Sequence, residues 1–421
     1  QLQDTIEKLK QEYRKKDCVI LYFIGLTESY EGEGYDRKNL KIPQNQEELL
    51  AEIAETVGRD HIAAISFGGA PMDFSFEKNV GAILHMYLGG QAVGESVADL
   101  ISGEVNPSGK LAETIPFSEK DTPAWRYFAP PNDDVEYRES IFVGYRYYET
   151  FHVPVKYPFG YGLSYTSFSY SELNVPEVYS GGKIQIRFKI KNIGKVSGAE
   201  IAQLYVCPNE SDVIRSHIEL KGFQKIYLHP GEEKEVILEL DERSFSVYDV
   251  EKKAFSMLSG KYQICIGASV HDLQLKANME VVGNSYFRNE RELFPDYFRE
   301  QPHGMEISAE QFYQLLGGEP KHDKEKKRGE YTVYDSYQDV VNVSMFGKFV
   351  RGVVHIGLKI ILRGKSERDP AFKMVKMGVE EGNLEGLIAT SGGIATPKLI
   401  DMLVYNANKK YLQAFKRLLK K

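Results

Sequence analysis

The carboxylates best placed for chemistry gather in one short loop near the start of the chain, from Glu28 to Arg37. Between these ends lie Glu31, Glu33 and Asp36, and Arg37 supplies a counter-ion. A loop carboxyl can act as a general acid when burial or a neighbouring carboxylate raises its pKa. Composition alone favours a plainer interpretation, an ion pair between Asp36 and Arg37 in a solvated loop. The spacing does not fit the calcium-binding EF-hand pattern, so a metal site is disfavoured.

The elements around this loop predict where it lies. Residues 18–24 form a continuous apolar run, typical of a strand buried on both faces, and 62–67 form a second. Helical spacing is found over 44–57, 77–88 and 92–101. Strands that alternate with helices predict a parallel α/β sheet, whose ligands bind beyond the carboxyl ends of the strands. The acidic loop directly follows the first strand, so we expect it at that edge.

The predicted sheet is short. Only two or three strands are expected before residue 120, and so small a parallel sheet would leave an edge exposed. We therefore expect that earlier strand–helix units of this domain are missing. Residues 117–170 are rich in proline, tyrosine and phenylalanine, which is typical of a loop region that wraps a surface or shapes a site.

The pattern of apolar and polar residues changes near residue 171. Alternating apolar and polar residues, separated by turn sequences, predict a β-sandwich with strands at 183–191, 200–206, 236–240 and 261–267. Polar residues and then renewed helical spacing complete the chain. We expect an α/β domain over 1–170, the β-sandwich over 171–285, a linker over 286–334 and a helical extension over 335–421.

The bulk composition excludes several classes of protein. A net charge of −7 disfavours a nucleic-acid binder, which normally carries a basic excess. Three cysteines cannot all pair, so we expect buried thiols and a reducing, cytoplasmic compartment. The chain has no Gly-x-Ser-x-Gly motif and no Cys/His cluster, so we expect no bound cofactor or metal. The basic stripe Lys348, Arg351, His355 and Lys359 could rest on a membrane, but a helix docked on the protein body is favoured.

An ordered series of motifs runs along the first two thirds of the chain. The motifs are Glu31-Gly-Glu-Gly-Tyr-Asp-Arg37, Leu40-Lys-Ile-Pro-Gln-Asn-Gln46, Gly89-Gly-Gln-Ala-Val-Gly-Glu-Ser-Val-Ala-Asp99, Gly103-Glu-Val-Asn-Pro-Ser-Gly-Lys-Leu111, Phe142-Val-Gly-Tyr-Arg-Tyr-Tyr148, Tyr157-Pro-Phe-Gly-Tyr-Gly-Leu-Ser-Tyr-Thr166, Asn192-Ile-Gly-Lys-Val-Ser-Gly-Ala-Glu-Ile-Ala-Gln-Leu-Tyr205 and Leu220-Lys-Gly-Phe223. Together they resemble the carboxyl-terminal α/β domain of family 3 glycoside hydrolases, especially bacterial β-glucosidases, followed by that family's fibronectin type III-like domain. Residues 286–421 resemble, less specifically, the helical extension of some of these enzymes.

The resemblance implies retaining, two-step hydrolysis of a terminal β-linked glucose from an oligosaccharide or glucoside. It implies that Glu33 is the general acid/base, with Glu31 as the alternative, and it places Asp36 and Arg37 at the substrate. The nucleophilic Asp of the family belongs to an amino-terminal barrel, which this chain does not contain. Because two carboxyl groups must cooperate, we expect the chain alone to be inactive and a barrel, from the same gene or a separate chain, to be its partner.

Two alternatives remain open. The chain could be a non-catalytic carbohydrate-binding or scaffold module, in which Trp125, the only tryptophan, stacks on a sugar ring. A β-xylosidase specificity is the alternative within the enzyme class, because substrate choice lies mostly in the barrel.

Overall fold

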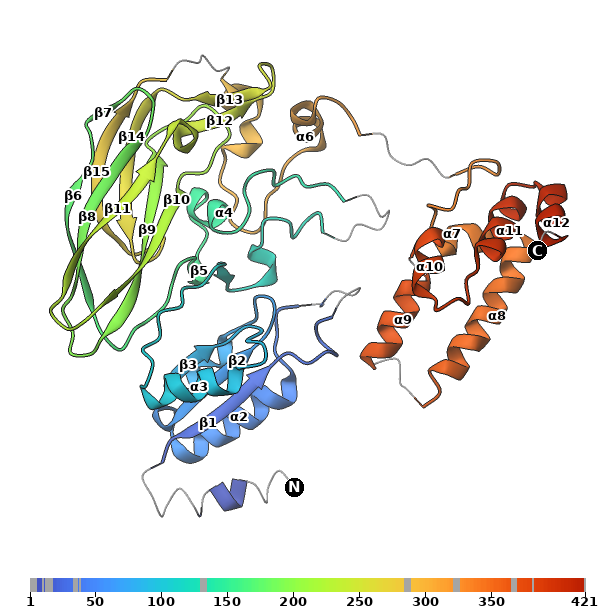
Figure 1. The fold of residues 1–421 in the computed structure, drawn as a ribbon, viewed down its shortest axis with the longest axis horizontal. Helices are drawn as coiled ribbons and strands as arrows, with labels where there is room; N and C mark the ends of the chain where they lie inside the picture. The colour runs from blue at the N-terminus through green and yellow to red at the C-terminus, as the bar shows by residue number, and fades with distance from the viewer. Residues whose placement is uncertain are drawn as a thin grey trace. The chain divides into compact units, whose positions relative to one another are not determined.

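The computed structural model describes residues 6–9, 11, 18–32, 37, 39–128, 135–283, 289–320, 326–364, 369–380 and 382–419. The chain divides into two compact units, one holding residues 1–24 and 40–320 and the other 25–39 and 321–421. The predicted fold class is confirmed: a parallel α/β sheet, a β-sandwich and carboxyl-terminal helices are all present (Figure 1).

The α/β part is built on a three-stranded sheet in the order β1-β2-β3. Strand β2 is parallel to β3, and its last residues bring Ser66 opposite His85. Ile62, Ala64 and Ile65 of β2 are buried, as expected for an apolar run in a central strand. The strands are β1 (Ile20–Gly25), β2 (Ile62–Phe67) and β3 (Ala82–His85), with helices α2 (Gln44–Val57) and α3 (Val93–Ser102) and short 3-10 turns η1 (Arg59–His61) and η2 (Ser75–Asn79).

The prediction of a helix over 77–88 is wrong. The structure ends the short turn η2 at Asn79 and places strand β3 over Ala82–His85. A short apolar run cannot be assigned to helix or strand by its spacing alone. Residues 82–85 become a strand because pairing with the edge of β2 satisfies their backbone hydrogen-bonding groups.

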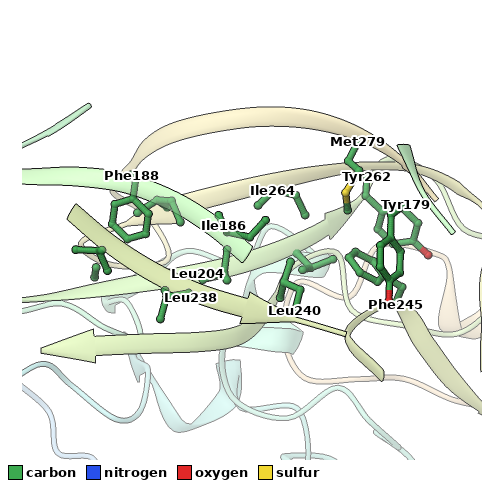
Figure 2. Close-up of a cluster of buried hydrophobic side chains, with 14 of the residues drawn as sticks. Tyr179, Ile186, Phe188, Leu204, Leu238, Leu240, Phe245, Tyr262, Ile264 and Met279 are labelled. Carbon is green, nitrogen blue, oxygen red and sulfur yellow. The ribbon is translucent and has the colours of Figure 1, made fainter. Parts of the chain in front are cut away.

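The β-sandwich consists of a five-stranded sheet, β10-β9-β14-β15-β7, and a three-stranded sheet, β11-β8-β6. Inward-facing side chains of both sheets form one core, which includes Ile186, Phe188, Leu204, Leu238 and Ile264 (Figure 2). The four predicted strands overlap β8, β9, β11 and β14. The strands are β6 (Phe168–Asn174), β7 (Val178–Tyr179), β8 (Ile184–Asn192), β9 (Gly198–Pro208), β10 (Glu219–Leu228), β11 (Glu233–Leu240), β14 (Gly260–Gly267) and β15 (Leu273–Val281), and a hairpin adds β12 (Ser246–Asp249) and β13 (Ala254–Met257).

The segment after the sandwich packs against the loop-rich region before it. Phe294, Tyr297 and Met305 are buried in one cluster with Phe142 and Tyr147, so this part of the expected linker is folded. Tyr147 fixes the contact by donating a hydrogen bond to the Gln301 carbonyl at 2.6 Å. The elements involved are β4 (Ile115–Pro116), η3 (Glu119–Asp121), α4 (Tyr145–Thr150), β5 (Val155–Tyr157), α5 (Glu290–Leu293), η5 (Pro295–Tyr297) and α6 (Ala309–Leu316), and η4 (Glu242–Phe245) lies in the sandwich.

The predicted helical extension is confirmed as a small bundle with its own core, in which Val340, Val341, Leu384 and Leu403 are buried. Several helices begin at side-chain caps; Ser344, for example, accepts a hydrogen bond from the Gly347 amide. Among the described residues, none of the helices has the length and apolar character that a membrane span requires. The helices are α7 (Tyr337–Asn342), α8 (Met345–Ile361), α9 (Pro370–Glu380), α10 (Leu384–Thr390), α11 (Pro397–Ala407) and α12 (Tyr411–Leu419).

Candidate active site

The acidic loop begins directly after strand β1. The amides of Tyr30 and Glu31 both donate to the Thr27 carbonyl, at 2.8 and 3.1 Å, and close one tight turn. Glu31 and Arg37 are half-buried, whereas Glu33 and Asp36 lie outside the described residues. The structure thus places the start and end of the predicted motif, and the role of its central carboxylate stays a prediction.

A helix of the extension contacts this loop. The loop residues 25–39 and the helices belong to the same compact unit. Lys373 on α9 donates a hydrogen bond from Nζ to the Ser29 carbonyl at 3.0 Å. This contact is local to the turn that precedes Glu31, and nothing in the sequence pattern indicated it.

A second polar group lies at the carboxyl ends of β2 and β3. His85 Nδ1 is 2.9 Å from Ser66 Oγ, and its ring lies 4.1 Å from that of Tyr87, centroid to centroid. Phe74 packs its edge against the same imidazole at 5.3 Å. Burial among these rings lowers the pKa of His85 to about 4, although the hydrogen bond with Ser66 opposes the change. His85 is therefore neutral near pH 7 and is not a charged anchor for an anion.

Glu77 is a carboxylate of the α/β part outside the acidic loop, and its partners exclude it as a general acid. Burial favours its protonated form, but an ion pair with Lys156 and a 2.7 Å hydrogen bond from Tyr157 outweigh burial and hold its pKa below the usual range. A general acid near neutral pH needs a raised pKa, so Glu77 serves as a structural counter-ion.

Trp125, the predicted stacking residue, belongs to a turn in which its amide donates to the Thr122 carbonyl at 3.2 Å. Its side chain is 42% exposed, so part of the indole surface is open to a ligand. Within the described ranges, no group of three or more His, Cys, Asp or Glu side chains is arranged to hold a metal ion.

Comparison with known protein families identifies two domains in this chain. Residues 2–165 match the glycosyl hydrolase family 3 C-terminal domain, and residues 200–270 match the fibronectin type III-like domain. Residues 2–165 are therefore a family 3 C-terminal domain. The match covers the sheet, the acidic loop and the His85 group in one domain of known type.

The family 3 relatives are longer proteins. The chain is 42% identical over 281 residues to thermostable β-glucosidase B of Acetivibrio thermocellus, covering 66% of this chain and 37% of that protein. It is 37% identical over 280 residues to an exo-α-(1→6)-L-arabinopyranosidase of Bifidobacterium breve, again covering 37% of the relative. The chain therefore spans little more than a third of the length of these relatives.

Solved family 3 structures share the fold. A β-glucosidase from Bifidobacterium adolescentis superposes with a TM-score of 0.62 and 36% identity, over 66% of this chain and 42% of that one. A β-glucosidase from Kluyveromyces marxianus, solved with glucose, gives a TM-score of 0.61 and 34% identity, over 66% and 34% of the two chains.

Sequence reasoning missed part of this family 3 domain. It treated His85 as an isolated histidine, whereas the structure pairs it with Ser66 and packs it against the tilted ring of Tyr87. The available signal was a polar residue, Ser66, inside the apolar run 62–67, and His85 lies in a segment predicted as a helix. That signal is weak, because strand register decides whether two such residues meet.

Proposed function

We propose that this chain supplies the general acid/base half of a retaining, exo-acting β-glucosidase. In this proposal Glu33 protonates the glycosidic oxygen, and an Asp on a barrel outside these 421 residues is the nucleophile. The observation that carries it is the acidic loop of a family 3 domain, attached at the end of strand β1. This is where open α/β sheets hold their ligands.

The chemistry follows from two carboxyl groups about 5–5.5 Å apart. The Asp attacks the anomeric carbon while Glu33 gives its proton to the departing oxygen, which leaves a glycosyl ester and a Glu33 carboxylate. That carboxylate then takes a proton from water, which attacks the anomeric carbon and releases the Asp.

Changing the acid/base gives a test that depends on the leaving group. In an assembled enzyme, Glu33→Gln should lower kcat/KM on aryl β-glucosides by about 10²–10⁴-fold when the phenol is a poor leaving group. The loss should shrink as the phenol becomes more acidic, because such a phenol departs without a proton.

Glu31→Gln is the matched control, since it removes a carboxylate from the same loop. It should change kcat/KM modestly and equally for all phenols. If Glu31→Gln shows the leaving-group dependence and Glu33→Gln does not, the roles of the two residues are reversed.

A barrel partner is supported by the surface of strand β1. Leu21 and Phe23 of β1, and Val19 just before it, alternate along one face and are 40%, 58% and 66% exposed, so the expectation that this run is buried on both faces is wrong. Apolar side chains grouped on one face of a sheet usually lie against another part of a protein. We propose that polypeptide outside these residues covers this face and contributes the nucleophile.

Mixing tests the partnership. The purified chain should not hydrolyse aryl β-glucosides measurably, and adding a barrel polypeptide from a family 3 β-glucosidase should produce activity. Leu21→Glu should weaken this gain by placing a charge in the contact, whereas Glu104→Ala should not. Turnover by the chain alone that is lost in Glu33→Gln would refute the requirement for a barrel.

A non-catalytic carbohydrate-binding module is the second candidate, favoured by the exposed indole of Trp125. Glycan binding that is lost in Trp125→Ala but kept in Glu33→Ala, with no activity after mixing, would support it. A β-xylosidase is the alternative within the enzyme class, and comparing kcat/KM on aryl β-glucosides and aryl β-xylosides would separate the two specificities.

A reducing, cytoplasmic location remains our proposal, and fractionation of source cells would test it.

A further inference from the structure

A cavity of about 340 Å³ lies between the end of helix α4, the loop joining β9 to β10, and residues 291–300. Its lining residues all belong to one compact unit. The volume is at the lower end of the range of about 300–1,000 Å³ that small-molecule sites occupy. None of its residues belongs to the acidic loop.

Two buried polar groups at this cavity lack a hydrogen-bond partner among the described residues. They are Arg215 Nε and the hydroxyl of Tyr297, on side chains that are 5% and 1% exposed. The other guanidinium nitrogens of Arg215 are used, by Tyr262 at 3.0 Å and Glu219 at 3.3 Å. An unsatisfied buried donor costs about 1–3 kcal/mol, so a small movement of the Arg215 side chain that brings Nε to a ligand oxygen would be favourable.

The charges around the cavity disfavour an anion. Three arginines line it, but each is paired with a carboxylate, and Glu210 and Glu300 add two further negative charges to the lining. An anionic ligand would meet no excess of positive charge there. The pairs are Arg215–Glu219 at 3.3 Å, Arg291–Asp212 at 3.1 Å and Arg299–Asp296 at 3.5 Å.

The remaining lining combines aromatic rings with small polar side chains, among them Thr150, Ser211 and Ser216. Phe142 and Phe151 pack edge to face with centroids 4.9 Å apart, and Phe298 lies 4.6 Å below the Arg291 guanidinium. Aromatic surfaces suit the C–H faces of a sugar, and hydroxyl groups can both accept from Arg215 and donate to Glu210 or Glu300.

We propose that this cavity is a saccharide-binding site for a neutral mono- or disaccharide, separate from the acidic loop. It goes beyond the proposed function, because it needs neither Glu33 nor the barrel. Such a site would hold a glycan chain on the protein independently of hydrolysis.

Isothermal titration calorimetry of the full chain with cellobiose tests the proposal, with glucuronate as an anionic comparison. Cellobiose should bind with a Kd on the order of 1 mM, and glucuronate more weakly. Asn209→Trp should fill the cavity and weaken cellobiose at least about 10-fold, and Glu300→Ala should weaken it several-fold by removing an acceptor. Asn209 suits this change because its side chain is exposed while its amide stays bonded to the Lys261 carbonyl.

Two controls separate this site from the acidic loop. Glu104→Ala, an exposed carboxylate outside the cavity, and Glu33→Gln should both leave the Kd unchanged. Loss of binding in Glu33→Gln would assign the sugar to the loop and overturn the proposal. So would an unchanged Kd in a folded Asn209→Trp, tighter binding of glucuronate, or no heat from cellobiose up to about 10 mM.

Discussion

His85 is a half-buried histidine of the α/β part whose pKa differs from that of a free histidine. Burial lowers its pKa from 6.5 to about 4, so the folded protein leaves it neutral at pH values where the unfolded chain protonates it. Stability should therefore fall as the pH drops from about 6.5 to about 4 and then stop changing for this reason. The expected loss is about 3 kcal/mol at most.

NMR titration of the ring protons and urea unfolding at a series of pH values would measure this effect. His85→Gln should flatten the pH dependence over that window, and His229→Gln, on an exposed turn, should not. An ordinary titration of His85 near pH 6.5 in the folded chain would contradict the burial argument.

At the scale of elements, helix α9 holds the turn that precedes the acidic residues. Lys373→Ala removes the hydrogen bond to the Ser29 carbonyl. A hydrogen bond contributes about 0.5–1.5 kcal/mol, so amide exchange over residues 29–32 should accelerate by roughly 2–12-fold. Lys376→Ala, on an exposed position of the same helix, is the matched control. Unchanged exchange in Lys373→Ala would show that α9 does not order the loop.

At the scale of the whole molecule, the core of the sandwich and the core of the helical bundle share no residue. Phe188→Ala and Leu403→Ala each create a cavity in one of these cores, which should lower the free energy of unfolding by about 3 kcal/mol. Hydrogen exchange should therefore rise in the sandwich for Phe188→Ala and in the bundle for Leu403→Ala. Equal acceleration of both regions by either variant would show that they unfold as one.

The fold followed from sequence wherever the local pattern was strong. Strand β2 matches its predicted bounds of 62–67, because a six-residue apolar run between turn residues has few other uses. The error over 77–88 arose where pattern and pairing disagreed, and pairing with β2 prevailed. The domain boundaries at 170, 285 and 334 remain predictions.

The sequence by itself determined the family resemblance, because the identity and order of the motifs can be read directly along the chain. It also identified Glu31 and Arg37 around the proposed acid/base Glu33. Only the tertiary structure decided which distant residues meet. Arg215, Phe142 and Phe298 line one cavity, and Ser66 reaches His85, because packing joins segments that have no shared local pattern. The physical reason is that side-chain type and spacing act along the chain, whereas burial, pKa and cavity shape arise from contacts across it.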